Sequence, residues 1–167
     1  MQQDTDELVA WMDRHGAALV LLARQWVGSH ADAEDVVQEA FVGFWRFRSR
    51  VRDPVAYLYG CVRREAQAWL RGRRRRCRRE QIAAADGQPR SEAAWCCGLE
   101  AVEESERIQA AMGRLPAEQR EVLVLHLWGE LTFAQIGAVL KVPPNTAASR
   151  YRYALASLRR QLAGNGG

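Results

Sequence analysis

The chain has 167 residues, of which 48% are apolar and 26% charged, and its formal net charge is +4. This composition predicts a folded protein of one medium or two small domains. No run of about 18 apolar residues is present, and the acidic start MQQDTDELVAWMDRHG differs from the basic and then apolar start of a secretory signal. We therefore expect a cytoplasmic protein without membrane insertion.

Charge is distributed unevenly along the chain. Residues 1–45 contain eight acidic residues and two arginines, whereas residues 46–79 contain thirteen arginines against Asp53 and Glu65. The arginines end in the run RGRRRRCRR at residues 71–79. Such a concentration is typical of a surface that binds a polyanion, because neutralised phosphates release counterions. A solvated helix end is the alternative explanation of this run.

The cysteines and histidines do not form a metal-binding pattern. Cys61, Cys77, Cys96 and Cys97 lack the CxxC spacing of zinc sites, and the histidines lie far from them in sequence. Redox sensing by the adjacent Cys96 and Cys97 stays open beside the simpler interpretation as two thiols. A phosphate-binding glycine loop and a nucleophile elbow are also absent from the sequence. We expect no cofactor, no metal and no catalytic activity.

Three amphipathic helices are predicted in the first half of the chain. The first runs to about Val27, the second begins at Ser29 or Asp32, and the third begins at Pro54 after the capping residue Asp53. Their core-facing positions recur at steps of three and four and are Leu8, Trp11, Met12, His15, Leu19, Leu22, Trp26, Val36, Val37, Ala40, Phe41, Phe44, Trp45, Val55, Leu58, Val62, Ala66 and Trp69.

Periodicity is lost at residues 83–98, where Asp86-Gly87 and Pro89 indicate a linker. Helices resume after residues 100–106, and a strongly apolar one that ends at Gly129 contains Val122, Leu123, Leu125, Leu127 and Trp128. No segment alternates convincingly enough to predict a strand. We expect an all-α fold of two small helical domains, residues 1–82 and 99–167, joined by a flexible linker.

Residues 131–162 have the pattern of a helix-turn-helix. The first helix places Phe133, Ile136, Gly137 and Leu140 inward, residues 141–144 form the turn, and Gly137 permits a close approach. Asn145 or Thr146 is expected to cap the second helix, whose buried positions are Ala147, Tyr151, Ala154, Leu158 and Leu162. Its polar face suits the major groove of DNA, although a solvated face in an ordinary helical bundle is the alternative.

Two segments resemble the extracytoplasmic-function (ECF) sigma factors of bacterial RNA polymerase. DAEDVVQEAFVGFW at residues 32–45 is similar to the second conserved region of that family, and residues 115–160 are similar to the fourth. The resemblance implies a sigma factor that directs core RNA polymerase to specific promoters and assists DNA opening. Its implied partners are core RNA polymerase and promoter DNA, and an anti-sigma factor is left open as a further partner.

The resemblance also assigns roles to residues. In the family the acidic helix docks on the clamp helices of the largest polymerase subunit, which implies polymerase binding by Asp32, Glu34, Asp35, Gln38 and Glu39, although capping and solvation could explain Asp32 and Glu34. The basic helix is similar to the element for the −10 promoter sequence, for which the chain offers Arg63, Arg64, Arg71, Arg73 and Arg74, beside Arg46, Arg48, Tyr57, Tyr59 and Trp69. Of these, Trp69 is expected in the core. The helix-turn-helix is similar to the −35 reader, which implies DNA contacts by Asn145, Thr146, Ser149, Arg150, Arg152 and Tyr153.

The chain departs from the family pattern in two places. Where relatives commonly read RNxxxD in the −10 helix, this chain has Arg63-Arg64 and Ala68, and Ala148 replaces a common lysine in the −35 helix. Neither domain alone is expected to bind DNA tightly, because the polymerase would set the distance between two weak sites. A free-standing helix-turn-helix regulator would explain the C-terminal third alone, and an enzyme has only isolated His and Cys residues in its favour.

Overall fold

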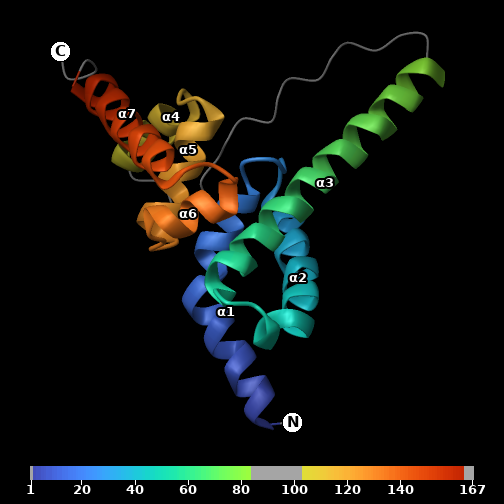
Figure 1. Ribbon diagram of the computed structural model, residues 1–167. Helices are drawn as coiled ribbons and strands as arrows, with labels where there is room; N and C mark the ends of the chain where they lie inside the picture. Colours follow the sequence, from blue (N-terminus) through green and yellow to red (C-terminus); the bar gives the residue numbers. More distant parts are fainter. Residues whose placement is uncertain (1, 84–102, 164–167) are drawn as a thin grey trace.

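The computed structural model describes residues 2–83 and 103–163, and every regular element in these ranges is helical (Figure 1). The predicted all-α fold is therefore confirmed. The N-terminal helices are α1 (Gln2–Ala23), α2 (His30–Phe47) and α3 (Pro54–Ala83), with the short 3₁₀ turn η1 (Arg48–Arg50) between the last two. The C-terminal helices are α4 (Glu103–Gly113), α5 (Ala117–Leu123), α6 (Phe133–Leu140) and α7 (Pro144–Ala163), with the π-helical turn η2 (Val124–Trp128) after α5.

The predicted linker, apart from Ala83, lies outside the described residues, and so do Cys96 and Cys97. Within the described ranges, no helix combines the length and the apolar character that a membrane span requires.

The starts of α2 and α3 follow from local capping chemistry. The Oγ of Ser29 accepts a hydrogen bond from the backbone N–H of Asp32 at 3.1 Å, so Ser29 is the cap of α2. The Oδ1 of Asp53 accepts from the backbone N–H of Ala56 at 3.0 Å, directly before α3. Each side chain satisfies a helix N–H that has no partner within the helix. Both predicted starts are thereby confirmed.

The N-terminal core is close to the one predicted, with Leu19, Leu22, Phe44, Leu58 and Val62 fully enclosed. Two details differ. The first helix ends at Ala23 rather than at about Val27, because the N–H of Gln25 bonds three residues back, to Leu22, and tightens the chain. Met12 is 36% exposed and borders a surface groove, so its predicted core position is wrong.

The apolar helix before Gly129 changes its winding, which alters its buried face. The N–H of Gly129 bonds to the carbonyl of Val124, five residues back, at 3.1 Å. This π-helical turn contains one more residue than an α-helical turn and rotates the residues after it. Val122 and Leu125 are fully buried, whereas Leu127 and Trp128 are 48% and 39% exposed.

The helix-turn-helix is present at α6 and α7. Thr132 and Gln135 form a reciprocal capping box at the start of α6. A Cβ on Gly137 would lie 2.7 Å from the carbonyl oxygen of Val142, so the predicted close approach is confirmed. The predicted cap of α7 is wrong, because α7 already begins at Pro144, which needs no N–H at the first helical position, and the carbonyl of Pro143 accepts from the N–H of Thr146.

The predicted inner face of α7 is largely confirmed. Ala147 and Ala154 are fully buried, and Tyr151, Leu158 and Leu162 are half-buried.

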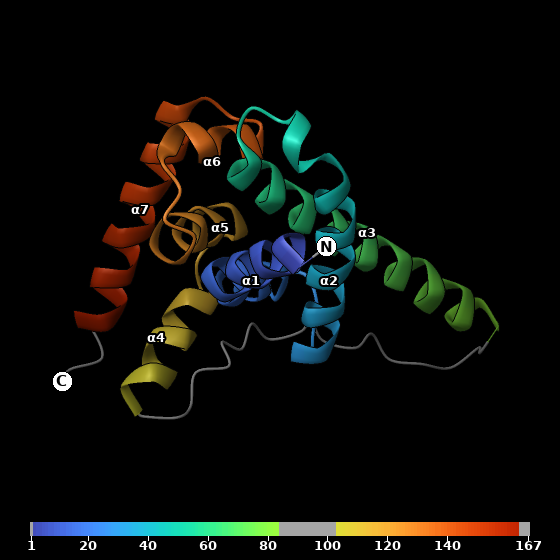
Figure 2. The same cartoon turned by 90° about the horizontal axis from the view of Figure 1, so that it is seen from below.

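The N-terminal and C-terminal helices are packed against each other. Their buried side chains form one continuous cluster, in which α3 contacts α6 and α1 contacts η2. Figure 2 shows α1 between α2 and the C-terminal helices. The far half of α3 projects away from this contact (Figure 1). The sequence had suggested two domains that a polymerase holds apart, whereas the structure has them in direct contact.

Candidate polymerase and DNA interfaces

Four of the five predicted polymerase-binding residues lie on the exposed side of α2. Glu34, Asp35, Gln38 and Glu39 are all exposed and form what we call the polar ridge. Glu34 also lies 3.3 Å from the Nε2 of His30, at the exposed start of the helix. Asp32 differs, since it is half-buried and its Oδ2 accepts a hydrogen bond from the Ser29 hydroxyl at 2.7 Å. Asp32 therefore takes part in the cap of α2, unlike the four residues of the polar ridge.

Val42 is an exposed apolar residue that the sequence analysis missed. It lies three and four residues after Glu39 and Gln38, so it continues the polar ridge by one turn. Its signal in the sequence is that it falls off the apolar stripe formed by Ala40, Phe41 and Phe44. An exposed valine beside carboxylates and an amide is suited to a protein interface.

An open groove of about 440 Å³ lies between α1, α2 and η2. Glu34 and Gln38 line it from α2, Met12 and Val20 from α1, and Trp128 from η2. The π-helical turn is what brings Trp128 to this groove, so the N-terminal and C-terminal helices together form its walls.

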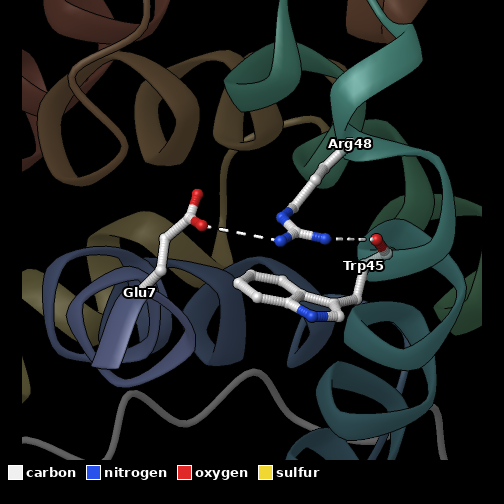
Figure 3. A network of polar contacts seen from close by, with 3 residues as sticks. All are labelled: Glu7, Trp45 and Arg48. Carbon is white, nitrogen blue, oxygen red and sulfur yellow. Dashed lines mark hydrogen bonds and ion pairs between the residues drawn. The ribbon is translucent and has the colours of Figure 1, made fainter. Parts of the chain in front are cut away.

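Arg48 is one of the arginines suggested for DNA binding, but its side chain contacts Trp45 and Glu7 of the N-terminal helices (Figure 3). Its guanidinium carbon lies 3.6 Å from the centre of the Trp45 ring, and its Nη1 donates to the Trp45 carbonyl at 2.9 Å. Its Nη2 lies 3.5 Å from the carboxylate of Glu7. Arg48 thus joins the start of α1 to the end of α2, while the neighbouring Arg46 is exposed.

The near half of α3 packs against the rest of the protein. Tyr59 is 0% exposed, so it cannot receive an unstacked base and its suggested role is wrong. Arg64 lies 5.6 Å from the Tyr57 ring centre and donates to the Sγ of Cys61 at 3.1 Å. Trp69 is half-buried, with the guanidinium of Arg73 at 5.4 Å from its ring.

The far half of α3 carries the exposed arginines. Arg71, Arg73 and Arg74 are exposed, as predicted for residues that contact a phosphate backbone, and Arg75, Arg76, Arg78 and Arg79 are exposed too. This half of the helix therefore presents a dense positive charge to solvent.

The predicted −35 residues lie together in the first turns of α7. Asn145, Arg152 and Tyr153 are exposed, and Thr146 and Ser149 are half-buried. The Nη2 of Arg152 donates to the Ser149 hydroxyl at 3.1 Å. Arg150 forms an ion pair with Glu118 of α5, at 2.8 Å. The structure thus brings all six residues together and adds a carboxylate partner for one of them.

Polar side-chain contacts cross between the N-terminal and C-terminal helices in the described part of the chain. Arg63 of α3 donates through its Nε to the carboxylate of Glu121 on α5, and both groups are largely buried. Gln135 of α6 donates through its Nε2 to the Oδ2 of Asp53 at 2.9 Å. Burial raises the pKa of Glu121, and the hydrogen bond and positive charge of Arg63 oppose this rise. Glu121 was not predicted from the sequence, although a lone glutamate directly before Val122 and Leu123 in an apolar run was a usable signal.

His15 is a buried titratable residue of α1. Its Nδ1 is 3.4 Å from the hydroxyl of Tyr59, and its ring is 5.3 Å from that of Trp11. Burial lowers the pKa of His15, Arg14 lowers it further, and Glu130 of the C-terminal helices raises it. Burial also raises the pKa of Tyr59, so its hydroxyl remains a donor. In the described part of the chain, no three His, Cys, Asp or Glu side chains gather closely enough to bind a metal ion.

Comparison with known proteins identifies both halves of the chain. The family description Sigma-70 region 2 matches residues 11–76, and Sigma-70, region 4 matches residues 105–158. The ECF RNA polymerase sigma factor SigL of Mycobacterium tuberculosis is 30% identical over 154 residues, which cover 92% of this chain and 87% of SigL. The chain belongs to the ECF family of RNA polymerase sigma factors.

Two solved structures share the fold. RpoE from Bartonella quintana, solved in complex with the anti-sigma factor NepR, has a TM-score of 0.71 at 21% identity over 99% of both chains. CnrH, solved with the cytosolic domain of CnrY, has a TM-score of 0.63 at 24% identity and covers 97% of this chain and 91% of its own. Region 2 thus comprises most of α1–α3, and region 4 most of α4–α7.

Membership in this family confirms the predicted function. The sigma factor associates with core RNA polymerase and directs it to promoter DNA, and the alternative of a free-standing regulator is not favoured.

Proposed function

We propose that the two regions of this sigma factor divide promoter recognition between them. Residues 1–82 dock on core polymerase through the polar ridge and bind the opened −10 strand along α3, and residues 99–167 read the −35 element with the start of α7. The observation that carries this proposal is the separation of charge, since the polar ridge of α2 is acidic and the exposed far half of α3 is covered with arginine. The acidic surface suits a protein partner and the cationic surface suits nucleic acid.

Strand capture in this proposal depends on charge more than on aromatic stacking. Single-stranded nucleic acid is held by cationic grooves and stacking platforms. Tyr59 is enclosed and Trp69 is half-buried, whereas the arginines at 71, 73 and 74 are exposed. We therefore assign backbone binding to the arginines and expect DNA opening without catalysis by this chain. It would act in the cytoplasm, where the polymerase is found, and without a cofactor.

We further propose an anti-sigma factor as a partner. RpoE was solved in complex with the anti-sigma factor NepR, and CnrH in complex with the cytosolic domain of CnrY. The groove between α1, α2 and η2 supports the extension to this chain, because it places Met12 and Trp128 at the surface beside the polar ridge.

Binding to core polymerase tests the docking assignment. Replacing Asp35 and Gln38 by alanine removes one charge and one amide from the polar ridge without touching the core, and we expect affinity for core polymerase to fall about tenfold. Titration of core polymerase with a fluorescent sigma factor measures this. Asp13→Ala, an exposed carboxylate on α1, is the control. Unchanged affinity of the double variant would remove the polar ridge from the interface.

Transcription from a random promoter library tests the −35 assignment. Arg150→Ala should relax base preference in the upstream element, because a bidentate arginine–guanine pair contributes about 1–3 kcal/mol of discrimination. Arg159→Ala, an exposed arginine near the far end of α7, is the control and should preserve the parent preference. An upstream preference that is identical in Arg150→Ala and the parent would contradict the assignment.

A further inference from the structure

The two α7 arginines that we assign to the −35 element have different surroundings. Arg152 is exposed, and its Nη2 donates to the hydroxyl of Ser149 on the same helix at 3.1 Å. The side chain of Arg150 is 24% exposed, and its Nη2 lies 2.8 Å from the carboxylate of Glu118 on α5. The charge of Arg150 is therefore balanced by a neighbouring helix, whereas the hydroxyl partner of Arg152 is neutral.

The pair of Glu118 and Arg150 lies within region 4, where α5 packs against α7. Glu118 is in the first turn of α5, and its side chain is 69% exposed. The pair is thus open to solvent at the edge of the surface that we assign to DNA. An exposed ion pair contributes little to stability. We therefore expect its loss to leave region 4 folded, so that an effect on DNA binding can be measured by itself.

Glu118 leaves Arg150 able to read a base. A guanidinium has several N–H donors in a fixed fork, and the contact with one carboxylate oxygen leaves other donors available. These donors can bind the acceptors on the edge of a guanine. Because Glu118 restrains the side chain before DNA arrives, less rotamer entropy is lost when Arg150 meets the base.

The charge of Glu118 also separates bases from phosphates. A phosphate binds an arginine largely through charge, which Glu118 already balances, and a nearby carboxylate repels it. The guanine edge is neutral and gains bidentate hydrogen bonds, so it is affected much less. Contacts with phosphate carry no direct sequence information. A balanced Arg150 therefore loses affinity for DNA of any sequence and keeps its contact with one base.

We propose that Glu118 is a specificity-determining residue of the −35 interface that acts through Arg150 and does not itself contact a base. It restrains the guanidinium and balances its charge, so that Arg150 binds a guanine edge in preference to the phosphate backbone. Arg152 has a neutral partner and supplies affinity that is independent of sequence. This inference rests on the proposed role of Arg150 in reading the −35 element.

Promoter binding by the polymerase holoenzyme tests this role. Glu118→Gln keeps the shape of the side chain and removes its charge. One fluorescent duplex carries the upstream element that the parent selects from the random library, and a second carries a scrambled element. We expect the ratio of the two affinities to fall about two- to tenfold, the range for ordering one long side chain. For the scrambled duplex, affinity should rise and the salt slope should steepen by up to about 0.9, because Arg150 gains a phosphate.

Glu130→Gln is the matched control, because it removes the same charge from another exposed glutamate of region 4. Its affinity ratio and salt slope should equal those of the parent. Thermal unfolding followed by circular dichroism checks that both variants are folded. A Glu118→Gln variant with the parent ratio overturns the inference, and so does a Glu130→Gln variant with an equal loss.

A double-variant cycle shows whether Glu118 acts through Arg150. In the Arg150→Ala background, Glu118→Gln should not lower the affinity ratio further. An undiminished loss in that background overturns the inference, because Glu118 would then act on DNA without Arg150. Arg150→Ala alone judges the proposed function, and an unchanged upstream preference in that variant removes both proposals. A preference that Arg150→Ala loses and Glu118→Gln keeps overturns only the role of Glu118.

Discussion

Gly137 shows how closely the backbone of the helix-turn-helix is packed. Its missing side chain leaves room for the carbonyl of Val142 and for the nitrogen of Pro144, which would lie 2.7 Å and 3.4 Å from a Cβ. Lys141, directly before Val142 in the chain, has a φ of 58°, in the left-handed region. The turn that aims α7 therefore depends on one residue without a side chain and on a neighbour that accepts an uncommon backbone conformation.

Substitution of Gly137 by alanine should destabilise the protein. The new methyl group meets backbone rather than a flexible side chain, so we expect a loss of about 1–3 kcal/mol in the free energy of unfolding. Urea denaturation followed by circular dichroism measures it.

Gly43→Ala is the matched control for this prediction. Gly43 lies inside α2, and a methyl group added there would have nothing within 4 Å, so alanine should stabilise the helix by about 0.5–1 kcal/mol. Equal effects of the two substitutions would show that the turn can relax.

At the scale of elements, α3 has two halves with different surroundings. Its first half is enclosed by α1, α2 and α6 and contributes Leu58, Tyr59 and Val62 to the core. Its second half projects from the molecule (Figure 1) and carries the exposed arginines. The same helix therefore anchors region 2 and extends a cationic surface beyond it, which leaves this surface accessible even while the regions are in contact.

The projecting half of α3 should control the salt dependence of DNA binding. Each phosphate that is neutralised contributes about 0.7–0.9 to the slope of log affinity against log salt concentration. Replacing Arg73 and Arg74 by alanine should therefore lower the slope for holoenzyme binding to a promoter by about 1 per residue that contacts a phosphate. Thermal stability should be unchanged, because both side chains are exposed.

Arg107→Ala, an exposed arginine on α4, serves as the control for this salt dependence. A slope that is the same for the Arg73 and Arg74 variant as for the parent would place the DNA elsewhere.

Most helices could be predicted from the sequence because their starts are local events. Ser29, Asp53 and the pair of Thr132 and Gln135 each act within a few residues, and apolar spacing gives the buried faces. The π-helical turn could not be predicted, because the apolar run that ends at Gly129 indicates a helix but not a change of its winding. Exposure of Leu127 and Trp128 follows from a hydrogen bond to a carbonyl five residues back, which has no sequence pattern of its own.

At the scale of the whole molecule, the sequence predicted the two regions and their family but not their contact. The polar ridge and the exposed arginines could be found from charge and spacing. Arg63 and Glu121 are 58 residues apart, and each looks ordinary beside its neighbours in the chain. Only the folded protein shows that one arginine of the basic helix is enclosed by the other region.

The stability of the molecule should depend on pH through His15. Burial lowers its pKa below the ordinary value of 6.5, so the unfolded chain takes up a proton more readily than the folded one. The contribution of neutral His15 to the free energy of unfolding is fully present above pH 6.5. It falls as the pH drops from 6.5 toward the pKa of the folded state. The slope for one proton is at most about 1.4 kcal/mol per pH unit.

Urea denaturation between pH 7.5 and pH 5 would measure this slope. His15→Gln, which cannot be protonated but can still accept a hydrogen bond from Tyr59, should flatten it. A slope that persists in His15→Gln would assign the titration to another group.

The hydrogen bond between Asp53 and Gln135 joins two side chains that each also cap the start of a helix. The Oδ1 of Asp53 accepts from the start of α3, and the Oε1 of Gln135 accepts from Thr132, so their hydrogen bond uses the remaining Oδ2 and Nε2. Parting the regions therefore breaks one hydrogen bond here and leaves both helix starts intact. Separation of the two regions would therefore need no melting of secondary structure at this point.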